Sequence, residues 1–558
     1  MTTRPADPYA AKPWLAVYRD GQAPSLWREH ADMLSLFRAA AASPDALALR
    51  YFDGALTFGD LDAASDALAV WLGGQGVGAG DRVCVILQNT PAFVIGLLAA
   101  WKLGAIPVPS NPMYRRDELA KLFADCEPGA VLCHDDHRPV VIEALRQAAR
   151  SAAVLAVSAY DGQSQDDARV LPPRVAPPVA TGGESLAAVL AAYAGRAPPD
   201  RTPKGQDLGL LLYTSGTTGQ PKGAMLRHDS MAFTSQIIRD WCGIGGDGAA
   251  ILGLAPLFHV TGIICHIGAA LSARCPLILT YRFEPSLMLE TIRERRPTFT
   301  IGAITAFNAL MNAPGAAAED FASFGATYSG GAPIAPALAD AIFERLGTRI
   351  WPAYGMTETT SPTHLCPLGV TPPVDPVSSA LSIGVPAPDT EAMIVGEDGR
   401  PMPVGEAGEV WMRGPQIMAG YWKKPAETAE ALSEGWMRSG DVGFMDPAGW
   451  FYLIDRKKDM ISASGFKVWP REVEDVLQTH PAVREAAVIG EPDPYRGETV
   501  KAFVSLKPGA AASAEDLASH CAERLAAYKR PRTVVILDEL PKTLTGKIQR
   551  AALRETAR

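Results

Sequence analysis

The first third of the chain alternates between short apolar runs and longer periodic segments. The apolar runs predict buried strands, and the periodic segments have the length and spacing of helices. Strands are expected at 83–87, 105–108 and 130–133, with helices at 92–103 and 117–126. The alternation returns after residue 207, where strands are expected at 208–212, 251–254, 276–279 and 298–301 and a helix at 285–296. This α/β order is typical of parallel sheets whose faces are covered by helices.

Two other regions do not follow this pattern. Residues 160–207 are rich in Pro, Gly, Asp and Ala and predict a mostly irregular connector. Beyond about residue 384, strand signals dominate, at 391–395, 408–412 and 449–454. Five consecutive charges at 455–459 then precede the signals of a small α+β domain, with helices at 471–479 and 514–527 and strands at 486–489 and 501–506. A charge run is ordinarily a solvated turn, and this one is a turn, a hinge or both.

Composition narrows the class of protein. The chain has 558 residues, of which 47% are hydrophobic and 20% charged, as expected of a soluble enzyme with more than one domain. The net charge of −9 argues against nucleic acid as a partner. The eight cysteines contain no C-x-x-C pair, so neither a disulfide scaffold nor a zinc site is indicated. The start lacks the apolar core of a signal peptide, and the most apolar stretch, 91–109, is interrupted by Lys102. A cytoplasmic location is expected, with peripheral membrane contact and a homodimer left open.

The segment from Tyr213 to Gly223, YTSGTTGQPKG, carries the clearest chemical signal. It follows the apolar run 208–212 and contains three Gly, four Ser or Thr and one Lys. Glycines let backbone N–H groups approach phosphate oxygens, hydroxyls donate hydrogen bonds and Lys222 neutralises charge, so the segment predicts a polyphosphate-binding loop. Its residue order differs from the G-x-x-x-x-G-K-[ST] loop of ordinary nucleoside triphosphatases. A flexible linker would need neither the preceding strand nor the Pro-Lys-Gly ending.

Four further motifs follow this loop in the chain. They are YGMTET at 354–359, SGD at 439–441, DRKKD at 455–459 with SGFK at 464–467, and PKTLTGK at 541–547. All five, in this order, resemble the AMP-forming adenylating enzymes, a family that includes acyl-CoA synthetases, peptide-synthetase adenylation domains and firefly luciferases. The similarity spans about residues 51–550. It implies a large N-terminal domain at 1–454 with parallel-rich sheets flanked by helices and a β-rich portion, a hinge at 455–458, and a small mobile α+β lid at 459–558.

The resemblance also implies a reaction in two steps. A carboxylate attacks the α-phosphate of ATP and forms an acyl adenylate with release of pyrophosphate, and a thiol then displaces AMP. The protein contributes positioning and charge neutralisation. ATP and Mg²⁺ are the implied cofactors. Coenzyme A is the expected thiol, because only eleven residues follow Lys547 and leave no room for a fused carrier domain.

The resemblance also implies which residues bind the nucleotide. The β- and γ-phosphates would be held by the loop residues Thr214, Ser215, Gly216, Thr217, Thr218, Gly219 and Lys222. The adenine would stack on Tyr354 and lie against Gly331, Ala332 and Pro333, and the nucleotide set also includes Gly355 and Met356. Thr357 would contact the α-phosphate, and the ribose hydroxyls would be held by Asp441 and Arg456. Thr214 and Glu358 would place Mg²⁺, which prefers hard oxygen ligands.

The residues expected to act on the reacting groups are Lys547, His259 and Glu358. Lys547 would bridge the carboxylate and the α-phosphate during adenylation, and its place near the C-terminus suits a moving lid. His259 matches a position beside the acyl carboxylate, although a neutral core histidine would look the same. Lys458 matches the family's hinge position. Gly465 either keeps a pantetheine tunnel open or is a simple turn glycine.

The substrate is less defined than the reaction. Residues 457–497 most resemble bacterial medium- and long-chain fatty acyl-CoA ligases. The expected pocket walls are small and apolar and lie at 260–264, 301–307 and 355–356, which excludes a charged side chain on the acid but does not separate an alkyl tail from an aryl ring. Alternatives are a ligase that loads a separate carrier protein, a luciferase-like oxygenase and a non-enzymatic nucleotide binder, and the last is disfavoured by the presence of both Lys222 and Lys547. The chain departs from the family pattern at Ser439, in place of Thr, and at Lys467, in place of Arg.

Overall fold

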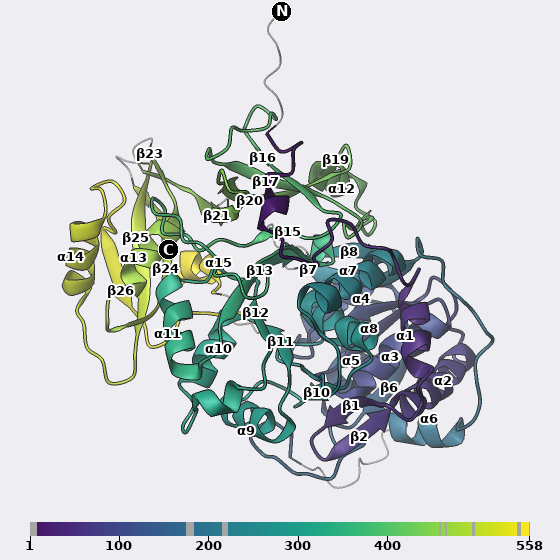
Figure 1. The fold of residues 1–558 in the computed structure, drawn as a ribbon. Coiled ribbons are helices and arrows are strands. Elements are labelled where there is room, and N and C mark those ends of the chain that lie inside the picture. Colours follow the sequence, from purple (N-terminus) through teal and green to yellow (C-terminus); the bar gives the residue numbers. More distant parts are fainter. Residues whose placement is uncertain are drawn as a thin grey trace, which may run out of the picture.

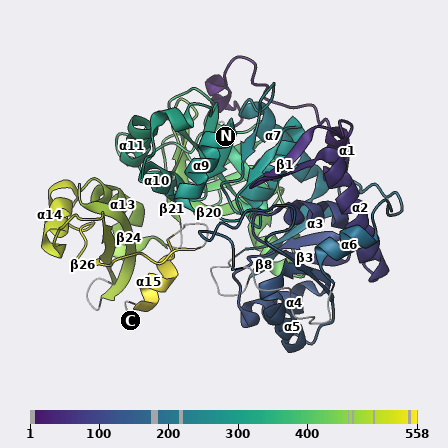
Figure 2. The same ribbon diagram turned by 90° about the horizontal axis from the view of Figure 1, so that it is seen from below.

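A computed structural model of the chain describes residues 8–173, 184–214, 221–456, 459–463, 466–493, 497–543 and 548–556. A large assembly of sheets and helices is formed by the residues up to 456, and a smaller α+β unit by the residues from 459 on (Figures 1 and 2). Within this described part of the chain, no helix has the length and apolar character needed to cross a membrane.

The first sheet confirms the strand–helix alternation expected near the N-terminus. Its strands are all parallel and lie in the order β4 (Ile106–Pro109), β3 (Arg82–Ile86), β5 (Pro128–His134) and β6 (Ala153–Val157). The connecting helices are α3 (Pro91–Lys102), α4 (Arg116–Cys126) and α5 (Arg138–Gln147). All 12 residues of α3 are buried, which explains why this helix is apolar on every side.

A nine-stranded sheet carries the candidate site. Its central strands are parallel and run in the order β13 (Ile350–Met356), β12 (Ala326–Ser329), β11 (Phe299–Gly302), β9 (Ile251–Leu252), β10 (Leu277–Leu279) and β1 (Leu47–Tyr51). Antiparallel strands flank them, β14 (Ser361–Leu365) and β15 (Val385–Pro386) at one edge and β2 (Gly54–Thr57) at the other. The helices that follow β10, β11 and β12 are α9 (Pro285–Arg295), α10 (Ile304–Met311) and α11 (Pro336–Leu346).

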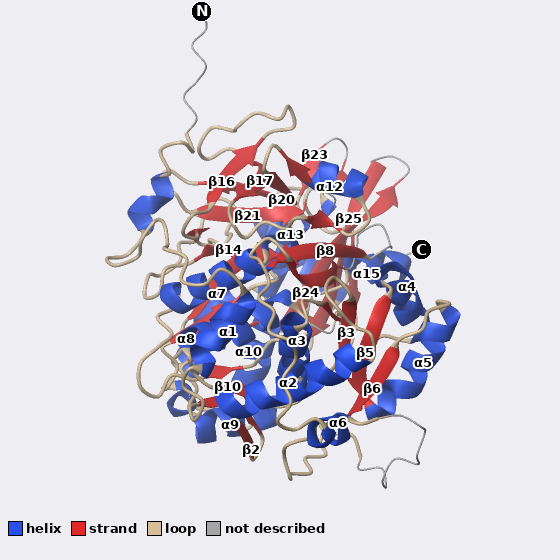
Figure 3. Cartoon of the chain, turned by 90° about the vertical axis from the view of Figure 1, so that its right-hand side faces the viewer, coloured by secondary structure: helices blue, strands red, loops and turns tan. Residues whose placement is uncertain are grey.

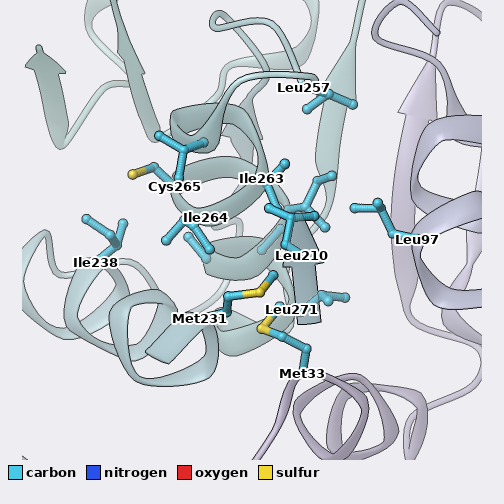
Figure 4. Close-up of a cluster of buried hydrophobic side chains, with 14 of the residues drawn as sticks. Met33, Leu97, Leu210, Met231, Ile238, Leu257, Ile263, Ile264, Cys265 and Leu271 are labelled. Carbon is cyan, nitrogen blue, oxygen red and sulfur yellow. The ribbon is translucent and has the colours of Figure 1, made fainter. Parts of the chain in front are cut away.

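The main hydrophobic core lies where several helices meet these sheets. The helices are α1 (Met33–Ala41), α2 (Phe58–Gly74), α6 (Leu186–Ala192), α7 (His228–Trp241), a π-helix (Gly262–Gly268) and α8 (Ala269–Ala273). Figure 4 shows Met33, Leu97, Leu210, Met231 and Ile263 converging from different elements of this core. Short 3₁₀ helices span Pro13–Val17, Asp135–His137, Ala318–Phe321 and Thr357–Thr359.

One expected parallel strand belongs to a different sheet. The apolar run 208–212 is part of β7 (Leu208–Thr214), which pairs antiparallel with β8 (Lys222–Arg227). The short strand β18 (Gly420–Tyr421) pairs antiparallel with β8 and completes a three-stranded sheet. An apolar run has the same pattern whether its neighbours run parallel or antiparallel, so the sequence predicts the strand and not its partners.

The β-rich portion expected after residue 384 is confirmed. It forms a five-stranded antiparallel sheet of β16 (Glu391–Val395), β17 (Gly408–Arg413), β20 (Trp436–Met445), β19 (Leu432–Ser433) and β21 (Phe451–Arg456), with β21 paired to β20. The short helix α12 (Pro425–Ala431) precedes β19. Two strands begin at the expected residues, Glu391 and Gly408. Strand β21 begins two residues after its expected start. It continues through Asp455 and Arg456 and so enters the predicted hinge.

The C-terminal unit has its own sheet and core. Figure 3 colours its strands and helices by type, together with those of the large assembly. Its strands are β22 (Ile461–Ala463), β23 (Phe466–Val468), β24 (Val483–Asp493), β25 (Gly497–Leu506) and β26 (Thr533–Ile536). Its helices are α13 (Pro470–Gln478), α14 (Ala514–Arg524) and α15 (Arg550–Thr556). Val473, Leu477, Val488 and Leu517 are among its buried core residues, so this unit buries apolar surface independently of the large assembly.

Candidate active site

The expected site residues gather at one edge of the nine-stranded sheet. Strands β9, β11, β12 and β13 are parallel neighbours, so their carboxyl ends meet at the same edge. His259 follows β9, the expected pocket wall 301–307 begins at the end of β11, Gly331 follows β12, and Tyr354 lies near the end of β13. Ligands of open α/β sheets bind at this edge. The topology therefore brings together residues separated by about a hundred positions in sequence.

The turn after β12 packs closely against β13. A Cβ atom on Gly330 would lie 2.7 Å from the carbonyl oxygen of Ala353, so only glycine fits there. Gly331 has φ of +80° and no atom within 4 Å of a Cβ built on it. The predicted adenine-lining residues Gly331, Ala332 and Pro333 are thus held next to the strand that carries Tyr354.

Tyr354 and Asp441 meet directly, although they come from different sheets. The Tyr354 hydroxyl donates a hydrogen bond of 2.8 Å to Oδ2 of Asp441. The backbone N–H of Asp441 donates to the Ser439 hydroxyl at 3.0 Å, which fixes the turn of the SGD motif. The register of β20 and β21 pairs Asp441 with Arg456. Three residues predicted to hold adenine and ribose are therefore adjacent.

The YGMTET motif forms a tight hairpin between β13 and β14. A Cβ atom on Gly355 would lie 2.1 Å from the Ser361 carbonyl oxygen, which requires glycine at this close approach. The Thr359 hydroxyl accepts from the backbone N–H of Met356 at 2.9 Å and donates to the carbonyl of Ser361 at 2.8 Å. Thr357 and Glu358 lie in the 3₁₀ turn of this hairpin, and Glu358 is buried. Thr360 and Ser361, which close this turn, have φ of +51° and +83°, and backbone strain of this kind is typical of functional positions.

The predicted phosphate loop is the connection of the β7–β8 hairpin. Thr214 and Lys222 are directly paired across the two strands, and the Thr214 hydroxyl lies 3.4 Å from the Lys222 carbonyl oxygen. The pairing places the second and the second-last residues of the motif at the same end of the hairpin. Ser215, Gly216, Thr217, Thr218 and Gly219 lie outside the described residues.

Tyr421 joins the phosphate hairpin to the YGMTET hairpin, and the sequence analysis missed it. Its hydroxyl donates a hydrogen bond of 2.8 Å to Oε1 of Glu358, and the ammonium of Lys222 lies 5.2 Å from the centre of its ring. Burial and the neighbouring Glu358 charge raise the pKa of Tyr421, so it keeps its proton. A Gly-Tyr pair between two turns has no distinctive pattern, and no sequence signal points to this residue.

Oxygen ligands for Mg²⁺ are available at this junction. Glu358 supplies a buried carboxylate, and Thr214 supplies a hydroxyl on the strand paired with Lys222. The described residues contain no group of three or more His, Cys, Asp or Glu side chains able to hold a metal on their own. Mg²⁺ often binds through one or two carboxylates together with substrate phosphates, so this sparse set of hard donors suits it.

His259 is positioned by a buried asparagine that the sequence analysis also missed. The side-chain amide of Asn89 donates to the carbonyls of Gly253 and Ala255 at 3.2 Å, and its oxygen accepts from the backbone N–H of Leu257 at 2.8 Å. This clamp orders the segment that leads into His259, which is half-buried and whose Nδ1 lies 3.2 Å from the Thr261 hydroxyl. Asn89 follows β3 of the first sheet and acts on the segment after β9 of the other sheet, so no local pattern in the sequence points to this role.

The π-helix continues from the expected wall 260–264 and contacts the two elements that carry the other expected walls. His266 Nε2 lies 3.1 Å from the Ile301 carbonyl oxygen, and Cys265 Sγ lies 3.2 Å from the Ser361 hydroxyl. The first contact joins the wall after His259 to the end of β11, and the second joins it to the hairpin that carries Gly355 and Met356. Burial lowers the pKa of His266 to about 4, so the ring is neutral. A π-helix is rare and is found mostly at functional sites.

Buried charges connect the end of β21 to the C-terminal unit. Oδ1 of Asp455 pairs with Arg550 at 3.0 Å, and Oδ2 accepts from the backbone N–H of Arg471 at 2.9 Å. Arg550 also pairs with Asp459 at 3.2 Å and with Glu474 at 2.8 Å. Burial raises the pKa of Glu474, and the charge of Arg550 opposes this effect. The predicted hinge therefore begins at a residue held by α13 and α15. Lys458, Gly465 and Lys547 lie outside the described residues.

Comparison with known proteins identifies the family. A family model described as AMP-binding enzyme matches residues 36–422, and a second, described as AMP-binding enzyme C-terminal domain, matches residues 472–547. The chain belongs to the AMP-binding enzyme family. The family resemblance inferred from the five motifs is thus confirmed, and so is the α/β fold with a large N-terminal and a smaller C-terminal domain.

Individual relatives of this AMP-binding enzyme are acid–CoA ligases. A long-chain-fatty-acid–CoA ligase of Bacillus subtilis (strain 168) is 35% identical over 557 residues, 98% of each chain. A feruloyl-CoA synthase of an Amycolatopsis species is 34% identical, over 93% of this chain and 97% of its own. The crystal structure of an anthranilate CoA ligase in complex with anthranoyl-AMP is 27% identical, has a TM-score of 0.83 and covers 96% of this chain and 98% of its own. This protein is an enzyme of the adenylate-forming acid–CoA ligase superfamily.

Proposed function

We propose that this enzyme activates a medium- or long-chain fatty acid with ATP and transfers the acyl group to coenzyme A. The observation that carries the proposal is the 35% identity to a long-chain-fatty-acid–CoA ligase over 98% of both chains. The apolar character of the segments around the π-helix is compatible with an alkyl tail, because burying methylene groups there releases about 0.8 kcal/mol each.

An aryl acid is the second candidate substrate. The feruloyl-CoA synthase is nearly as similar, at 34% identity over 93% of this chain. An aromatic ring would suit the same apolar walls, since residues 260–264 and 301–307 contain no charged side chain. The two candidates share the adenylation chemistry and differ only in what fills the acyl pocket.

In the first step, a carboxylate oxygen of the acid forms a bond to the α-phosphorus of ATP. The bond between the α-phosphorus and the bridging oxygen breaks, and pyrophosphate leaves with the electron pair. Lys222 and the hydroxyls of the phosphate loop hold the β- and γ-phosphates, and Lys547 neutralises charge at the α-phosphate. Tyr354 supports the adenine, while Asp441 and Arg456 hold the ribose. Preorganised donors of this kind lower the barrier without rearranging in the transition state.

In the second step, the thiolate sulfur of coenzyme A bonds to the acyl carbon. The anhydride bond between that carbon and the phosphate oxygen breaks, and AMP leaves with its electron pair. His259 lies beside the acyl carboxylate. Between the two steps, the small domain turns about the segment 455–458. This rotation takes Lys547 away from the reacting centre and brings the face that carries Gly465 to it. Free coenzyme A is the acceptor in this proposal, and a separate carrier protein is the acceptor to be tested against it.

Thr214 and Glu358 would hold Mg²⁺ together with the ATP phosphates. Bound there, the ion would supply positive charge that stabilises the leaving pyrophosphate. Replacing Glu358 with Gln keeps the size of the side chain and removes its charge. The Glu358→Gln variant is expected to bind Mn²⁺ with a nonhydrolysable ATP analogue at least tenfold more weakly, about 1.4 kcal/mol, as measured by electron paramagnetic resonance. An unchanged Mn²⁺ titration would show that the metal ligand lies elsewhere.

Pyrophosphate release across a panel of acids tests the proposed substrate. Octanoate, palmitate, ferulate and benzoate are supplied with ATP, each with and without coenzyme A. A fatty acid is expected to give the highest kcat/KM, and thioester is expected only with coenzyme A. A higher kcat/KM for ferulate or benzoate would replace the fatty acid by the aryl candidate. Acyl adenylate that accumulates with coenzyme A present would favour the carrier-protein acceptor.

A further inference from the structure

Tyr421 occupies a position between two groups of the proposed phosphate and metal site. Its side chain is buried, with 8% of the residue exposed, as is that of Glu358, also with 8% exposed. Its hydroxyl lies 2.8 Å from Glu358 Oε1, and its ring lies 5.2 Å from the Lys222 ammonium. One side chain therefore contacts both the expected metal carboxylate and the expected phosphate-binding cation.

The hydroxyl of Tyr421 determines which way the Glu358 carboxylate can point. Within the described ranges of the chain, Tyr421 is the one side chain that donates a hydrogen bond to this carboxylate. A buried carboxylate without a donor is costly, so the group is held in the orientation that keeps this bond. The bond uses Oε1 and leaves the second oxygen to face another ligand.

The backbone around Tyr421 reinforces the same connection. The N–H of Met418 donates to the Glu358 carbonyl at 2.8 Å. Four residues later, the N–H of Trp422 donates to the Gly223 carbonyl at 2.7 Å, next to Lys222. The segment 418–422 therefore spans from the YGMTET hairpin to the phosphate hairpin, and it fixes their separation through both main chain and side chain.

The backbone of Tyr421 is itself held in place from the other side. Gly420 has φ of +139°, and a Cβ atom on it would lie 2.7 Å from Cγ2 of Thr428. The N–H of Tyr421 donates to the Thr428 hydroxyl at 2.9 Å. The glycine and the threonine together fix the backbone from which the Tyr421 side chain reaches Glu358 and Lys222.

We infer that Tyr421 is a positioning residue that assembles the metal carboxylate and the phosphate-binding lysine as one unit. The hydroxyl orients Glu358 for the metal, and the ring face attracts the Lys222 ammonium and keeps it beside the phosphates before nucleotide binds. The inference rests on the proposed function, which names Glu358 as a metal ligand and Lys222 as a phosphate ligand. The hydroxyl acts on Glu358 and the ring acts on Lys222, so the two effects can be separated.

The Tyr421→Phe and Tyr421→Leu variants separate these effects. Phenylalanine keeps the ring and removes only the hydroxyl, whereas leucine removes both. The Tyr452→Phe variant is the matched control, because the buried Tyr452 also donates to a carboxylate, at 3.0 Å to Asp446 Oδ2, but outside the site. Binding of Mn²⁺ is measured by electron paramagnetic resonance with α,β-methylene-ATP and no acid. Binding of the analogue alone is measured in EDTA by calorimetry.

The Tyr421→Phe variant is expected to bind Mn²⁺ about tenfold more weakly, the scale of one hydrogen bond to a charged group, with unchanged affinity for the analogue in EDTA. The Tyr421→Leu variant is expected to lose analogue affinity in EDTA as well, by about threefold. Tyr452→Phe is expected to match the parent in both titrations. In the steady state with the preferred acid, Tyr421→Phe should raise the Mg²⁺ concentration at half-maximal rate and lower kcat less than tenfold.

Parent-like Mn²⁺ binding by Tyr421→Phe would overturn the inference. Equal weakening in Tyr421→Phe and Tyr452→Phe would also overturn it, because the loss would then be general destabilisation. The titrations contain no acid, so they do not depend on which acid is the substrate. A parent enzyme that binds Mn²⁺ and the analogue but uses no fatty acid would refute the proposed substrate and leave the role of Tyr421 standing.

Discussion

The Tyr354 hydroxyl donates a hydrogen bond of 2.8 Å to Oδ2 of Asp441, and this bond links the nine-stranded sheet to the antiparallel sheet of β20. It fixes the carboxylate that we expect to accept from the ribose hydroxyls. The Tyr354→Phe variant keeps the aromatic face for adenine and removes this hydrogen bond from the carboxylate. Its KM for ATP is expected to rise about tenfold with a smaller change in kcat, the scale of one hydrogen bond to a charged group.

Asp441→Asn is the companion variant to Tyr354→Phe. It is expected to raise the KM for ATP more strongly, since it changes the ribose ligand itself. Steady-state rates at varied ATP and saturating acid measure both variants. A parent-like KM in Tyr354→Phe beside a large increase in Asp441→Asn would show that the carboxylate does not need Tyr354 for its orientation.

Lys547 is predicted to act in the first step alone. The Lys547→Ala variant is expected to lose acid-dependent exchange of pyrophosphate into ATP by at least a hundredfold, because charge at the α-phosphate is no longer neutralised. Thioester formation from a supplied acyl adenylate should persist near the parent rate. The two half-reactions are measured separately. Equal loss in both would assign Lys547 a structural role.

Lys458 is predicted to be the pivot of the small domain. The Lys458→Pro variant fixes φ at this position and is expected to keep adenylation within a few fold while losing most transfer to coenzyme A. The Lys458→Ala variant removes the same side chain without restricting the backbone, and it should retain both steps. If Lys458→Pro forms thioester from acyl adenylate at the parent rate, the pivot lies elsewhere.

Arg550 is predicted to hold the C-terminal domain against the hinge. Asp455 and Asp459 have side chains only 4% and 8% exposed, and each pairs with Arg550. The Arg550→Met variant would leave these carboxylates without that cation, at a cost of about 3 kcal/mol. Faster hydrogen exchange is expected in α13 and β24. The Arg524→Met variant, which removes an exposed arginine of α14, should exchange like the parent.

Acid is predicted to destabilise the large domain through its buried histidines. His134, His228, His266 and His364 are buried, and burial lowers the pKa of the first three to about 4 and that of His364 to about 3. Their unfolded pKa is near 6.5, so the unfolded chain binds more protons between about pH 6.5 and 4. Stability is therefore lost as the pH falls through this window, by about 1.4 kcal/mol per histidine per pH unit.

One carboxyl group acts in the opposite direction. Burial raises the pKa of Asp161 to about 6, so its protonation favours the folded state over part of the same window. The histidines outnumber it, and the melting temperature of the large domain is expected to fall between pH 7 and pH 5. The His364→Gln variant should show a shallower fall than the parent, whatever its stability at pH 7. An identical pH dependence would mean that His364 is protonated in the folded state.

Local pattern predicted strands β3, β4, β5, β9, β10 and β11 of the parallel sheets and helices α3, α4 and α9. Helix α4 was expected at 117–126 and spans Arg116–Cys126, because its polar and apolar positions follow the helical period. Strands β8, β12 and β13 were not singled out, although β13 carries Tyr354. The residues of β13 include Pro352 and Gly355, and they do not alternate between apolar and polar. The strand still forms, because it pairs with a parallel strand on one side and with a bulged hairpin on the other.

The site was predictable to the extent that it consists of motifs. Tyr354, Glu358 and Asp441 were identified through contiguous segments, and the structure brings Tyr354 and Asp441 into contact. Tyr421 and Asn89 were missed because each acts through a tertiary contact made far from its own position in sequence. A single side chain that orients another residue leaves no local pattern, so only the fold can reveal it.

The contact between Asp455 and Arg550 has a consequence for exchanging domains between related enzymes. The segment from 455 to 550 begins and ends at this one ion pair, so the two ends of the small domain come from the same place on its surface. A fusion joint placed after Ile454 keeps the carboxylate and its arginine in one parent. A joint placed after Arg456 would take Asp455 from one parent and Arg550 from the other. The small domain of such a chimera is expected to dock less firmly.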